Sequence, residues 1–327
     1  MHAIVQHEFG PAEALRYEEA PDPEPGAGQV RIAVAAAGVH VLDTAIRRGE
    51  AGGPFPPPDL PMIPGREVAG RVDHVGPGVD DTWLDRPVVA HLGMASGGYA
   101  EVAVAAADVV HTIPGGLDPA AAVAMIGTGR TAIGILDAAE IVPDDIVLVT
   151  AAAGGLGALL VQAARNAGAA VVGLAGGPDK VERVRKLGAS AAVDYRATGW
   201  ADEARAALGD RTPTLLLDGV GGDAARDACD LLGPAGRVVL FGASSGAPLA
   251  LTTADLAARS LRATWALGPR LFGRPGGIRA LETEALAEAA AGRLVPLVND
   301  PFPLAEAAAA HRAIEGRATV GKVVLVP

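Results

Sequence analysis

Two polar side chains stand out in the first part of the chain, which is otherwise rich in small apolar residues. His40 lies in "GVHVLD" and Arg66 lies in "PGREVAG". A histidine titrates near neutral pH and is a common metal ligand. An arginine is a permanent cation that cannot ligate a metal, but its N–H groups can stabilise a developing negative charge. These residue types raise the question of whether the site uses a metal or never needed one.

A glycine-rich turn is the second feature with chemical meaning. The apolar run 145–151 predicts a buried parallel strand, "AAGGLG" follows it, and "ALLVQAARNAGA" predicts an amphipathic helix. Glycines at 154 and 155 permit a tight turn and a close approach to a pyrophosphate, and Gly157 permits close helix packing. We therefore predict a dinucleotide site that includes Ala153, Gly154, Gly155, Leu156 and Gly157. Because Ala152 occupies the first glycine position, a plain strand-to-helix turn remains the alternative.

The end of the next predicted strand indicates which nicotinamide cofactor is bound. An NAD site usually has a carboxylate about 20 residues beyond the glycines, and the sequence has Ala175 there. The absence of an acid permits a 2′-phosphate, which Lys180 and Tyr195 are placed to contact. NADPH is therefore favoured over NADH. The alternatives are an exposed helix lysine and a tyrosine that packs at a strand end.

The surrounding elements fall into two textures. Residues 1–110 contain short strand-like segments separated by Pro and Gly, which predicts a β-rich domain. From about Leu117 strands and helices alternate, which predicts a doubly wound sheet of six parallel strands. The loops "DGVGG" and "FGASSG" follow two of these strands and are expected at the carboxyl edge of the sheet, where ligands bind; ordinary turns are the alternative.

Composition limits the possible partners. The chain has 327 residues and a net charge of -11, which argues against nucleic acid or an anionic membrane as the main partner. Its single cysteine excludes an intrachain disulfide framework and a multi-cysteine zinc site. The N-terminus does not resemble a signal peptide, and no apolar run reaches the roughly 20 residues of a membrane span. We expect a cytoplasmic protein with a small-molecule substrate.

Several segments taken together resemble one family from end to end. "PPPDLPMIPGREVAGRVDHVGPGV", "AAAGGLG", "LDGVGG", "FGASSG" and "GKVVLVP" look like the zinc-free quinone oxidoreductase (zeta-crystallin-like) branch of the medium-chain dehydrogenase/reductase superfamily. The resemblance implies an α/β protein with a GroES-like β-rich catalytic domain, 1–120 and 266–327, and a Rossmann NADP-binding domain, 121–265. It also implies a cofactor cleft between the domains and a homodimer formed through the last strand of the sheet.

The resemblance carries cofactor contacts onto particular positions. It implies that Lys322 lies near the nicotinamide, and that NADPH is also contacted by Thr128, Lys180, Tyr195, Gly219, Val220, Phe241, Gly242, Ser244 and Ser245.

The same resemblance answers the metal question. Zinc-dependent relatives place three ligands at the positions of His40, Arg66 and Thr128. Only His40 can ligate here, and a catalytic zinc needs three protein ligands. We therefore expect no zinc and a hydride transfer from NADPH to a quinone or another activated α,β-unsaturated carbonyl. The protein's task is then mainly to position the reactants and exclude water.

The chain departs from the family pattern around the expected substrate cleft, which includes Asp43 and Phe55. His40 stands where asparagine is usual, Arg66 where a small or hydroxyl residue is usual, and Phe55 where tyrosine is common. Our hypothesis is that His40 or Arg66 is catalytic and stabilises the developing oxyanion. The alternatives are a His40 with all its partners satisfied, an Arg66 that pairs with Glu67 or Asp43, and an Arg66 that selects an acidic or polar acceptor.

Two other functions fit the same sequence. An enoyl-thioester reductase of polyketide or fatty-acyl type uses the same fold and cofactor, and thioester against quinone activity separates the two. A non-catalytic NADPH-binding protein would bind the cofactor without turnover.

Overall fold

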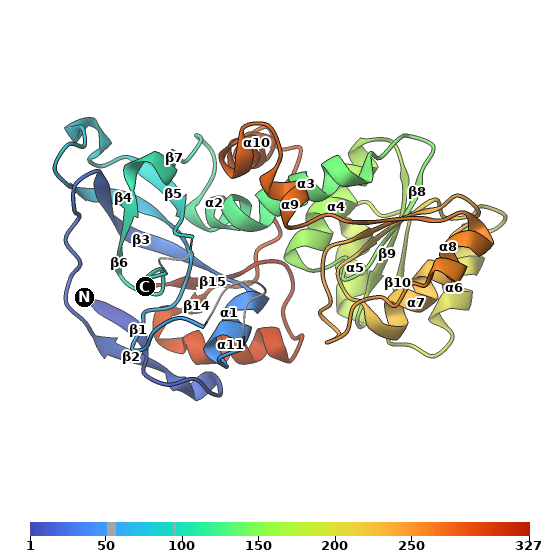
Figure 1. Ribbon diagram of the computed structural model, residues 1–327, viewed down its shortest axis with the longest axis horizontal. Coiled ribbons are helices and arrows are strands. Elements are labelled where there is room, and N and C mark those ends of the chain that lie inside the picture. Colours follow the sequence, from blue (N-terminus) through green and yellow to red (C-terminus); the bar gives the residue numbers. More distant parts are fainter. Residues whose placement is uncertain (51–56, 94–95) are drawn as a thin grey trace. The chain divides into compact units, whose positions relative to one another are not determined.

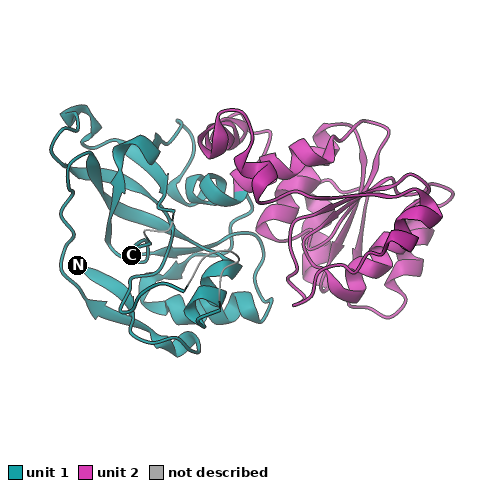
Figure 2. Cartoon of the chain, viewed as in Figure 1, with its two compact units in different colours: residues 1–128, 296–327 teal, residues 129–295 magenta. Residues whose placement is uncertain are grey.

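The protein was analysed as a computed structural model that describes residues 1–50, 57–93 and 96–327. The chain forms two compact units, one of residues 1–128 and 296–327 and one of residues 129–295 (Figure 2). The first unit therefore contains both chain termini, and the second is a single continuous segment.

The first unit is built on a seven-stranded sheet of order β14-β15-β3-β4-β5-β7, with β6 paired to β3 (Figure 1). A separate antiparallel hairpin joins β1 and β2. The strands are β1 His2–Gln6, β2 Leu15–Glu19, β3 Gln29–Val39, β4 Glu67–Val75, β5 Pro87–His91, β6 Val102–Ala106, β7 Val110–Thr112, β14 Phe302–Pro303 and β15 Val323–Val326. The β-rich texture predicted for residues 1–110 is confirmed.

Small aliphatic side chains make the core of this sheet. Ile32, Val68 and Val88 are completely buried, and they lie on the neighbouring strands β3, β4 and β5. A Cβ on Gly70 would lie 1.9 Å from the Ala33 carbonyl oxygen, so β3 and β4 approach each other as only a glycine permits. The strand register shifts beside this point, between Val34 and Ala36. The helices of the unit are α1 Val41–Arg47, α2 Pro119–Ala124 and α11 Ala307–Glu315, with a π-helical turn at Met125–Gly129.

The second unit contains a six-stranded parallel sheet of order β10-β9-β8-β11-β12-β13. Its strands are β8 Ile146–Val149, β9 Ala170–Ala175, β10 Ala191–Asp194, β11 Leu215–Asp218, β12 Arg237–Leu240 and β13 Arg262–Trp265. The order reverses between β8 and β11, as in doubly wound dinucleotide folds. This confirms the predicted architecture, because the continuous apolar runs form strands that are buried on both faces.

Helices lie on both sides of this sheet (Figure 1). The helices of this unit are α3 Arg130–Ala139, α4 Gly155–Asn166, α5 Pro178–Lys186, α6 Trp200–Leu208, α7 Gly222–Asp230, α8 Thr253–Arg259, α9 Pro269–Phe272 and α10 Gly277–Ala290. Short 3-10 turns complete the described chain at Ala12–Ala14, Asp81–Trp83, Ala107–Val109 and Leu304–Glu306.

The compact units differ from the boundaries expected at 120 and 266. Residues 121–128 belong to the first unit, because α2 packs on β3 and β4. Residues 266–295 belong to the second unit, because α10 packs on α3. The chain returns to the first unit at Pro296 rather than at 266.

One helical stretch corrects the expectation about apolar runs. The helical stretch Pro119–Ala139 is long and apolar enough to cross a membrane, judged by length and composition. Most of it is buried inside the protein. Core helices of soluble proteins meet the same criteria, so this stretch is weak ground for a membrane span.

Candidate active site

Three strand ends of the first unit bring His40, Glu67 and Lys322 together. Val323 of β15 pairs with Val39 of β3, so Lys322 and His40 lie at adjacent ends of these two strands. Strand β4 pairs with the other side of β3 and begins at Glu67. The antiparallel register therefore gathers residues that are up to 282 positions apart in the chain.

Glu67 is the centre of this cluster. Its carboxylate oxygens form ion pairs with His40 Nε2 at 2.6 Å and with Lys322 Nζ at 2.7 Å. The Glu67 side chain has no exposed surface, Lys322 is 4% exposed, and His40 is 24% exposed. A Cβ would lie 1.5 Å from the carboxylate on Gly127 and 2.2 Å from it on Gly38. The two glycines therefore provide the space that the buried carboxylate occupies.

The charges of the cluster explain why a carboxylate can be buried here. Burial alone would raise the pKa of Glu67, but His40 and Lys322 outweigh it and hold the pKa well below its usual range. Glu67 is therefore an anion at neutral pH. His40 Nε2 also lies 2.8 Å from Lys322 Nζ. One ring nitrogen can donate to Glu67 when protonated or accept from Lys322 when not, so His40 has a close partner in either state.

Arg66 is held on a second carboxylate. Its Nε donates to Asp43 Oδ1 at 3.2 Å, and Asp43 Oδ2 accepts from the backbone N–H of His40 at 2.8 Å. The Tyr99 hydroxyl donates to the same oxygen at 3.2 Å. Asp43 and Tyr99 are buried. The alternative in which Arg66 pairs with Asp43 is therefore what the structure shows, and Asp43 links the side chain of Arg66 to the backbone of His40.

This second network continues into α11. The Tyr99 hydroxyl lies 3.2 Å from His311 Nε2, and Arg47 bridges His311 to Glu315. Burial lowers the pKa of His311 to about 4, so this ring is neutral at physiological pH. Burial and the charge of Asp43 raise the pKa of Tyr99 well above its usual value, so its hydroxyl keeps its proton. Asp43 is thus held by donors that do not change near neutral pH.

The glycine-rich turn of the second unit has the geometry of an anion site. Helix α4 begins at Gly155 directly after β8 and the turn, and Gly154 is its N-cap. A Cβ on Gly157 would lie 2.3 Å from the Ala151 carbonyl oxygen, which confirms the tight helix-to-strand packing predicted for that glycine. Leu156 is in the first turn, and Ala153 immediately precedes Gly154. Free N–H groups at such a helix start favour a phosphate.

The loops after β11 and β12 pack against each other. Ser245 N donates to the Val220 carbonyl at 2.8 Å, and Ser244 N donates to the Gly219 carbonyl at 3.2 Å. A Cβ on Gly219 would lie 2.5 Å from the Phe241 ring, and one on Gly242 would lie 2.7 Å from the Gly219 carbonyl oxygen. The structure therefore brings these six predicted cofactor residues together. Asp218, completely buried, fixes the first loop by accepting from the N–H groups of Val220 and Gly221.

Lys180 and Tyr195 follow β9 and β10, the two strands that lead from β8 to one edge of the sheet. Lys180 is in the first turn of α5, which follows β9, and Tyr195 follows β10. A Cβ on Gly176 would lie 3.5 Å from the Tyr195 hydroxyl and 3.0 Å from Arg196 Cδ. Asp194 is occupied by the N–H groups of Gly177 and Arg196, both within 3.0 Å.

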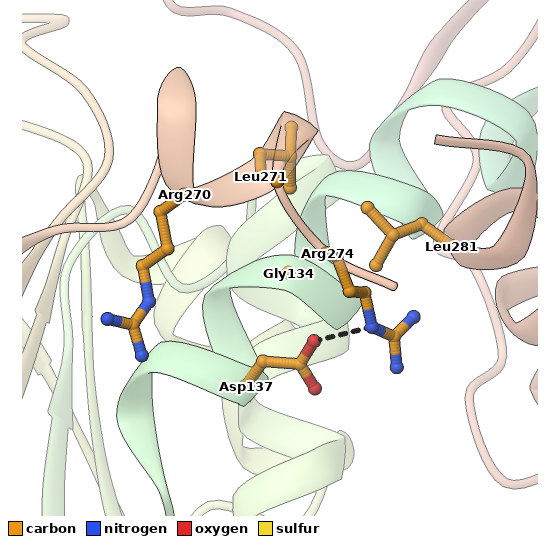
Figure 3. A pocket seen from close by; sticks show the side chains of 7 residues that line it. Gly134, Asp137, Arg270, Leu271, Arg274 and Leu281 are labelled. Carbon is orange, nitrogen blue, oxygen red and sulfur yellow. Dashed lines mark ion pairs between the residues drawn. The ribbon is translucent and has the colours of Figure 1, made fainter. Parts of the chain in front are cut away.

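A cavity of about 200 Å³ lies elsewhere in the second unit, against α3, α9 and α10 (Figure 3). Arg274 pairs with Asp137 at 2.9 Å and with Glu284 at 2.7 Å. Burial raises the pKa of Asp137 despite this arginine. Arg270, Leu271 and Arg274, from the segment that follows β13, line part of the cavity.

The structure separates the predicted residues into groups within each unit. Thr128 is buried in the π-helical turn of the first unit, next to Gly127. Phe55 lies outside the described residues. Glu67 was overlooked as a site residue. The signal that could have revealed it is an acid among the small apolar residues of "EVAG" at the start of a buried strand.

Comparisons with known proteins identify the family of this chain. The family model for the alcohol dehydrogenase GroES-like domain matches residues 26–115, and the model for zinc-binding dehydrogenases matches residues 155–273. A 2-haloacrylate reductase from Burkholderia sp is 33% identical over 99% of this chain and 98% of its own length.

Solved structures of the same kind cover the whole chain. The quinone oxidoreductase of Escherichia coli in complex with NADPH matches with a TM-score of 0.84 and 31% identity over 100% of both chains. A structure described as an NAD-dependent alcohol dehydrogenase matches with a TM-score of 0.89 and 30% identity, again over 100% of both chains. The fold and site thus define a two-unit dehydrogenase/reductase. The chain belongs to the zinc-free quinone oxidoreductase branch of the medium-chain dehydrogenase/reductase superfamily.

The Glu67 cluster gives a prediction about stability. Glu67→Gln leaves the buried Lys322 ammonium without its carboxylate, so the free energy of unfolding at pH 7 should fall by about 3 kcal/mol. The native pKa of Glu67 lies below its ordinary value of 4.5, so the contribution is fully present above that pH and disappears on further acidification. Urea unfolding from pH 7 downward measures both effects.

The matched control is Glu13→Gln in the same unit. Glu13 is 64% exposed and pairs with Arg312 at 2.6 Å, so its change should stay within about 0.5 kcal/mol. An equal loss in both variants, or no loss for Glu67→Gln, contradicts the importance given to the buried cluster.

Proposed function

We propose that this protein reduces a quinone or another activated α,β-unsaturated carbonyl compound with NADPH and without zinc. The observation that carries the proposal is His40 Nε2, which lies between the Glu67 carboxylate and the Lys322 ammonium. This arrangement supplies cationic groups and a titratable ring at the position where zinc-dependent relatives bind metal. Arg66 and Thr128, at the other two such positions, do not complete a ligand set.

The residues of the second unit fit NADPH. The glycine turn and the start of α4 suit the pyrophosphate, and the loops of Gly219 and Phe241 form one continuous edge beside it in the strand order. Lys180 and Tyr195 suit the 2′-phosphate, because no carboxylate ends β9 and Asp194 is held by backbone N–H groups. When bound, NADPH supplies a hydride to the electron-poor carbon of the acceptor.

The residues of the first unit then manage the proton and the charge. A reduced quinone or enolate gains a negative charge on oxygen and must take up a proton. His40 is the most exposed member of the cluster, at 24%, whereas Glu67 and Lys322 are buried. We assign His40 the role of donor to the developing oxyanion, with Glu67 and Lys322 as the residues that position it. Arg66, held on Asp43, adds a fixed positive charge.

The relatives support this range of acceptors. A quinone and a 2-haloacrylate both present an electron-poor carbon conjugated to oxygen, and proteins named for each resemble this chain over nearly its whole length. The enoyl-thioester alternative would require the same hydride transfer to a bulkier acceptor. Under the non-catalytic alternative, the buried cluster of His40, Glu67 and Lys322 would have only a stabilising role.

A panel of acceptors tests the function. NADPH oxidation is followed with 1,4-benzoquinone, a small enone, 2-chloroacrylate and crotonyl thioester, using protein whose zinc content is known. We expect turnover with the quinone or the small unsaturated carbonyls. Exclusive turnover of the thioester favours the enoyl-reductase alternative, and tight NADPH binding with no turnover favours the non-catalytic one.

Cofactor choice gives a second prediction. Lys180→Ala should raise KM for NADPH about 10-fold, as expected for the loss of one charge-assisted phosphate contact, and should leave KM for NADH nearly unchanged. The control is Lys186→Ala on the same helix, where the lysine is 70% exposed and paired with Glu182. If Lys180→Ala raised KM for NADPH and for NADH equally, Lys180 would not bind the 2′-phosphate.

We further propose that the protein is a cytoplasmic homodimer joined through β13. This strand ends the six-stranded sheet, and Trp265 on it is 49% exposed. An unpaired edge strand with an exposed aromatic side chain favours pairing with a second copy. Trp265→Lys should shift the mass in sedimentation from that of a dimer toward the 32.7 kDa of the single chain.

The control for the dimer is Leu84→Lys, which adds the same charge at a 41% exposed position in the first unit and should leave the dimer intact. A monomeric wild-type protein rejects the proposed assembly.

A further inference from the structure

We propose that Arg66 is a substrate-binding residue that selects α,β-unsaturated carboxylates by binding the carboxylate group. The proposal rests on the reductase function above and names an acceptor class for that site. It also reassigns Arg66 from a general oxyanion donor to a specific carboxylate ligand. The starting observation is that the structure fixes one part of this guanidinium and leaves another part open.

The backbone of Arg66 is fixed on both sides. Gly65 has φ +93°, and a Cβ there would lie 2.3 Å from the ring of Tyr99, so the chain reaches Arg66 through a tight packing contact. The Arg66 carbonyl accepts from the backbone N–H of Leu92 at 2.7 Å. Glu67 follows at the start of β4, so Arg66 is the last residue before that strand.

The guanidinium is anchored through one nitrogen. Nε donates to Asp43 Oδ1 at 3.2 Å, and Asp43 is itself held by the His40 N–H and the Tyr99 hydroxyl. The Asp43 side chain is only 3% exposed, so the carboxylate that holds Arg66 is itself fixed inside the protein. Within residues 1–50, 57–93 and 96–327, Nη1 and Nη2 of Arg66 have no hydrogen-bonding partner, and the side chain is 14% exposed. The hydrogen bond from Nε to Asp43 therefore fixes the orientation of Nη1 and Nη2.

An open pair of Nη groups matches a carboxylate. A planar guanidinium offers parallel N–H donors at the spacing of the two carboxylate oxygens, and such bidentate pairs are stronger than neutral hydrogen bonds. A quinone has no carboxylate and gains nothing from this geometry. A lysine at this position would supply the charge without the two parallel donors. The structure thus offers an anionic acceptor a contact that a neutral acceptor cannot use.

Reduction of a 2-haloacrylate requires only a hydride from NADPH and a proton. For a 2-haloacrylate, the hydride from NADPH adds to the CH₂ carbon and a proton adds to the carbon that bears the halogen. The products are a 2-halopropionate and NADP⁺, with the carbon–halogen bond intact. Pairing the carboxylate with Arg66 withdraws electron density from the double bond, which makes hydride addition more favourable. Arg66 would therefore both orient and activate this acceptor.

A matched pair of acceptors tests the proposal. 2-Chloroacrylate and methyl 2-chloroacrylate carry the same double bond, but only the first is an anion. Arg66→Gln should lower kcat/KM for the acid about 30-fold relative to the ester, which is the size of one lost charge-assisted contact. Arg66→Lys should fall between wild type and Arg66→Gln. Activity with 1,4-benzoquinone should fall less than activity with the acid in both variants, because the quinone has no carboxylate and so loses no bidentate contact.

Arg71→Gln is the control. Arg71 lies on β4, the strand that follows Arg66, and it is exposed and donates to the Asp85 carbonyl. This variant therefore removes the same charge without changing the Asp43–Arg66 hydrogen bond. It should leave the ratio of acid to ester unchanged. Equal losses on acid and ester in Arg66→Gln, or no loss on either, overturns the proposal. So does a wild-type protein that reduces the quinone and the ester but not the acid.

A binding measurement separates this proposal from the reductase function. 2-Chloropropionate has no double bond to reduce, and it should quench or shift the fluorescence of NADPH bound to wild-type protein but not to Arg66→Gln. If no acceptor is turned over, the reductase function fails, and this binding difference still decides the role of Arg66. Equal binding to both proteins would overturn it.

Discussion

The burial of Glu67 is the constraint on which the site depends. A carboxylate with no exposed surface requires positive charge beside it, and Lys322 and His40 supply it within 2.7 Å. It also requires space, which Gly38 and Gly127 provide by having no Cβ. The ends of β3, β4 and β15 meet where these requirements are satisfied together. The same contacts hold His40 between the Glu67 carboxylate and the Lys322 ammonium. One arrangement therefore stabilises the sheet ends and fixes the position of the His40 ring.

Two carboxylates divide the chemistry of the first unit. Glu67 holds His40 and Lys322, whereas Asp43 holds Arg66 and also accepts from the backbone of His40. Both carboxylates are buried, so water does not compete with them for their hydrogen-bonding partners. Asp43 is further fixed by Tyr99, whose neighbour His311 stays neutral because burial lowers its pKa to about 4. The guanidinium of Arg66 is therefore held in a defined orientation.

Much of the fold could be predicted because its signals are local. The apolar runs of β8 and β11 and the glycine turn between β8 and α4 are each read within a few residues. The boundary near 266 could not be read in this way. Helix α10 has the alanine-rich sequence "GIRALETEALAEAA", whose composition favours a helix but does not indicate which unit it packs on. Packing against α3 is a long-range contact, and it places residues 266–295 in the second unit.

The site shows the same limit. His40 and Arg66 could be identified as chemically unusual residues, and Lys322 could be named from the family resemblance. Their partners could not be predicted, because the meeting of His40, Glu67 and Lys322 depends on the register of three strands that are distant in sequence. Glu67 was missed for this reason. A carboxylate beside "VAG" looks like an ordinary strand end until β15 is placed against β3.

The central claim is that side chains, and not a metal, handle the charge that develops on the acceptor. The most direct measurement is the single-turnover rate of NADPH oxidation by 1,4-benzoquinone, before and after treatment with a zinc chelator, with zinc measured in both samples. We expect the same rate in both samples and far fewer zinc ions than protein chains. A rate that falls after chelation and returns when Zn²⁺ is added would contradict it.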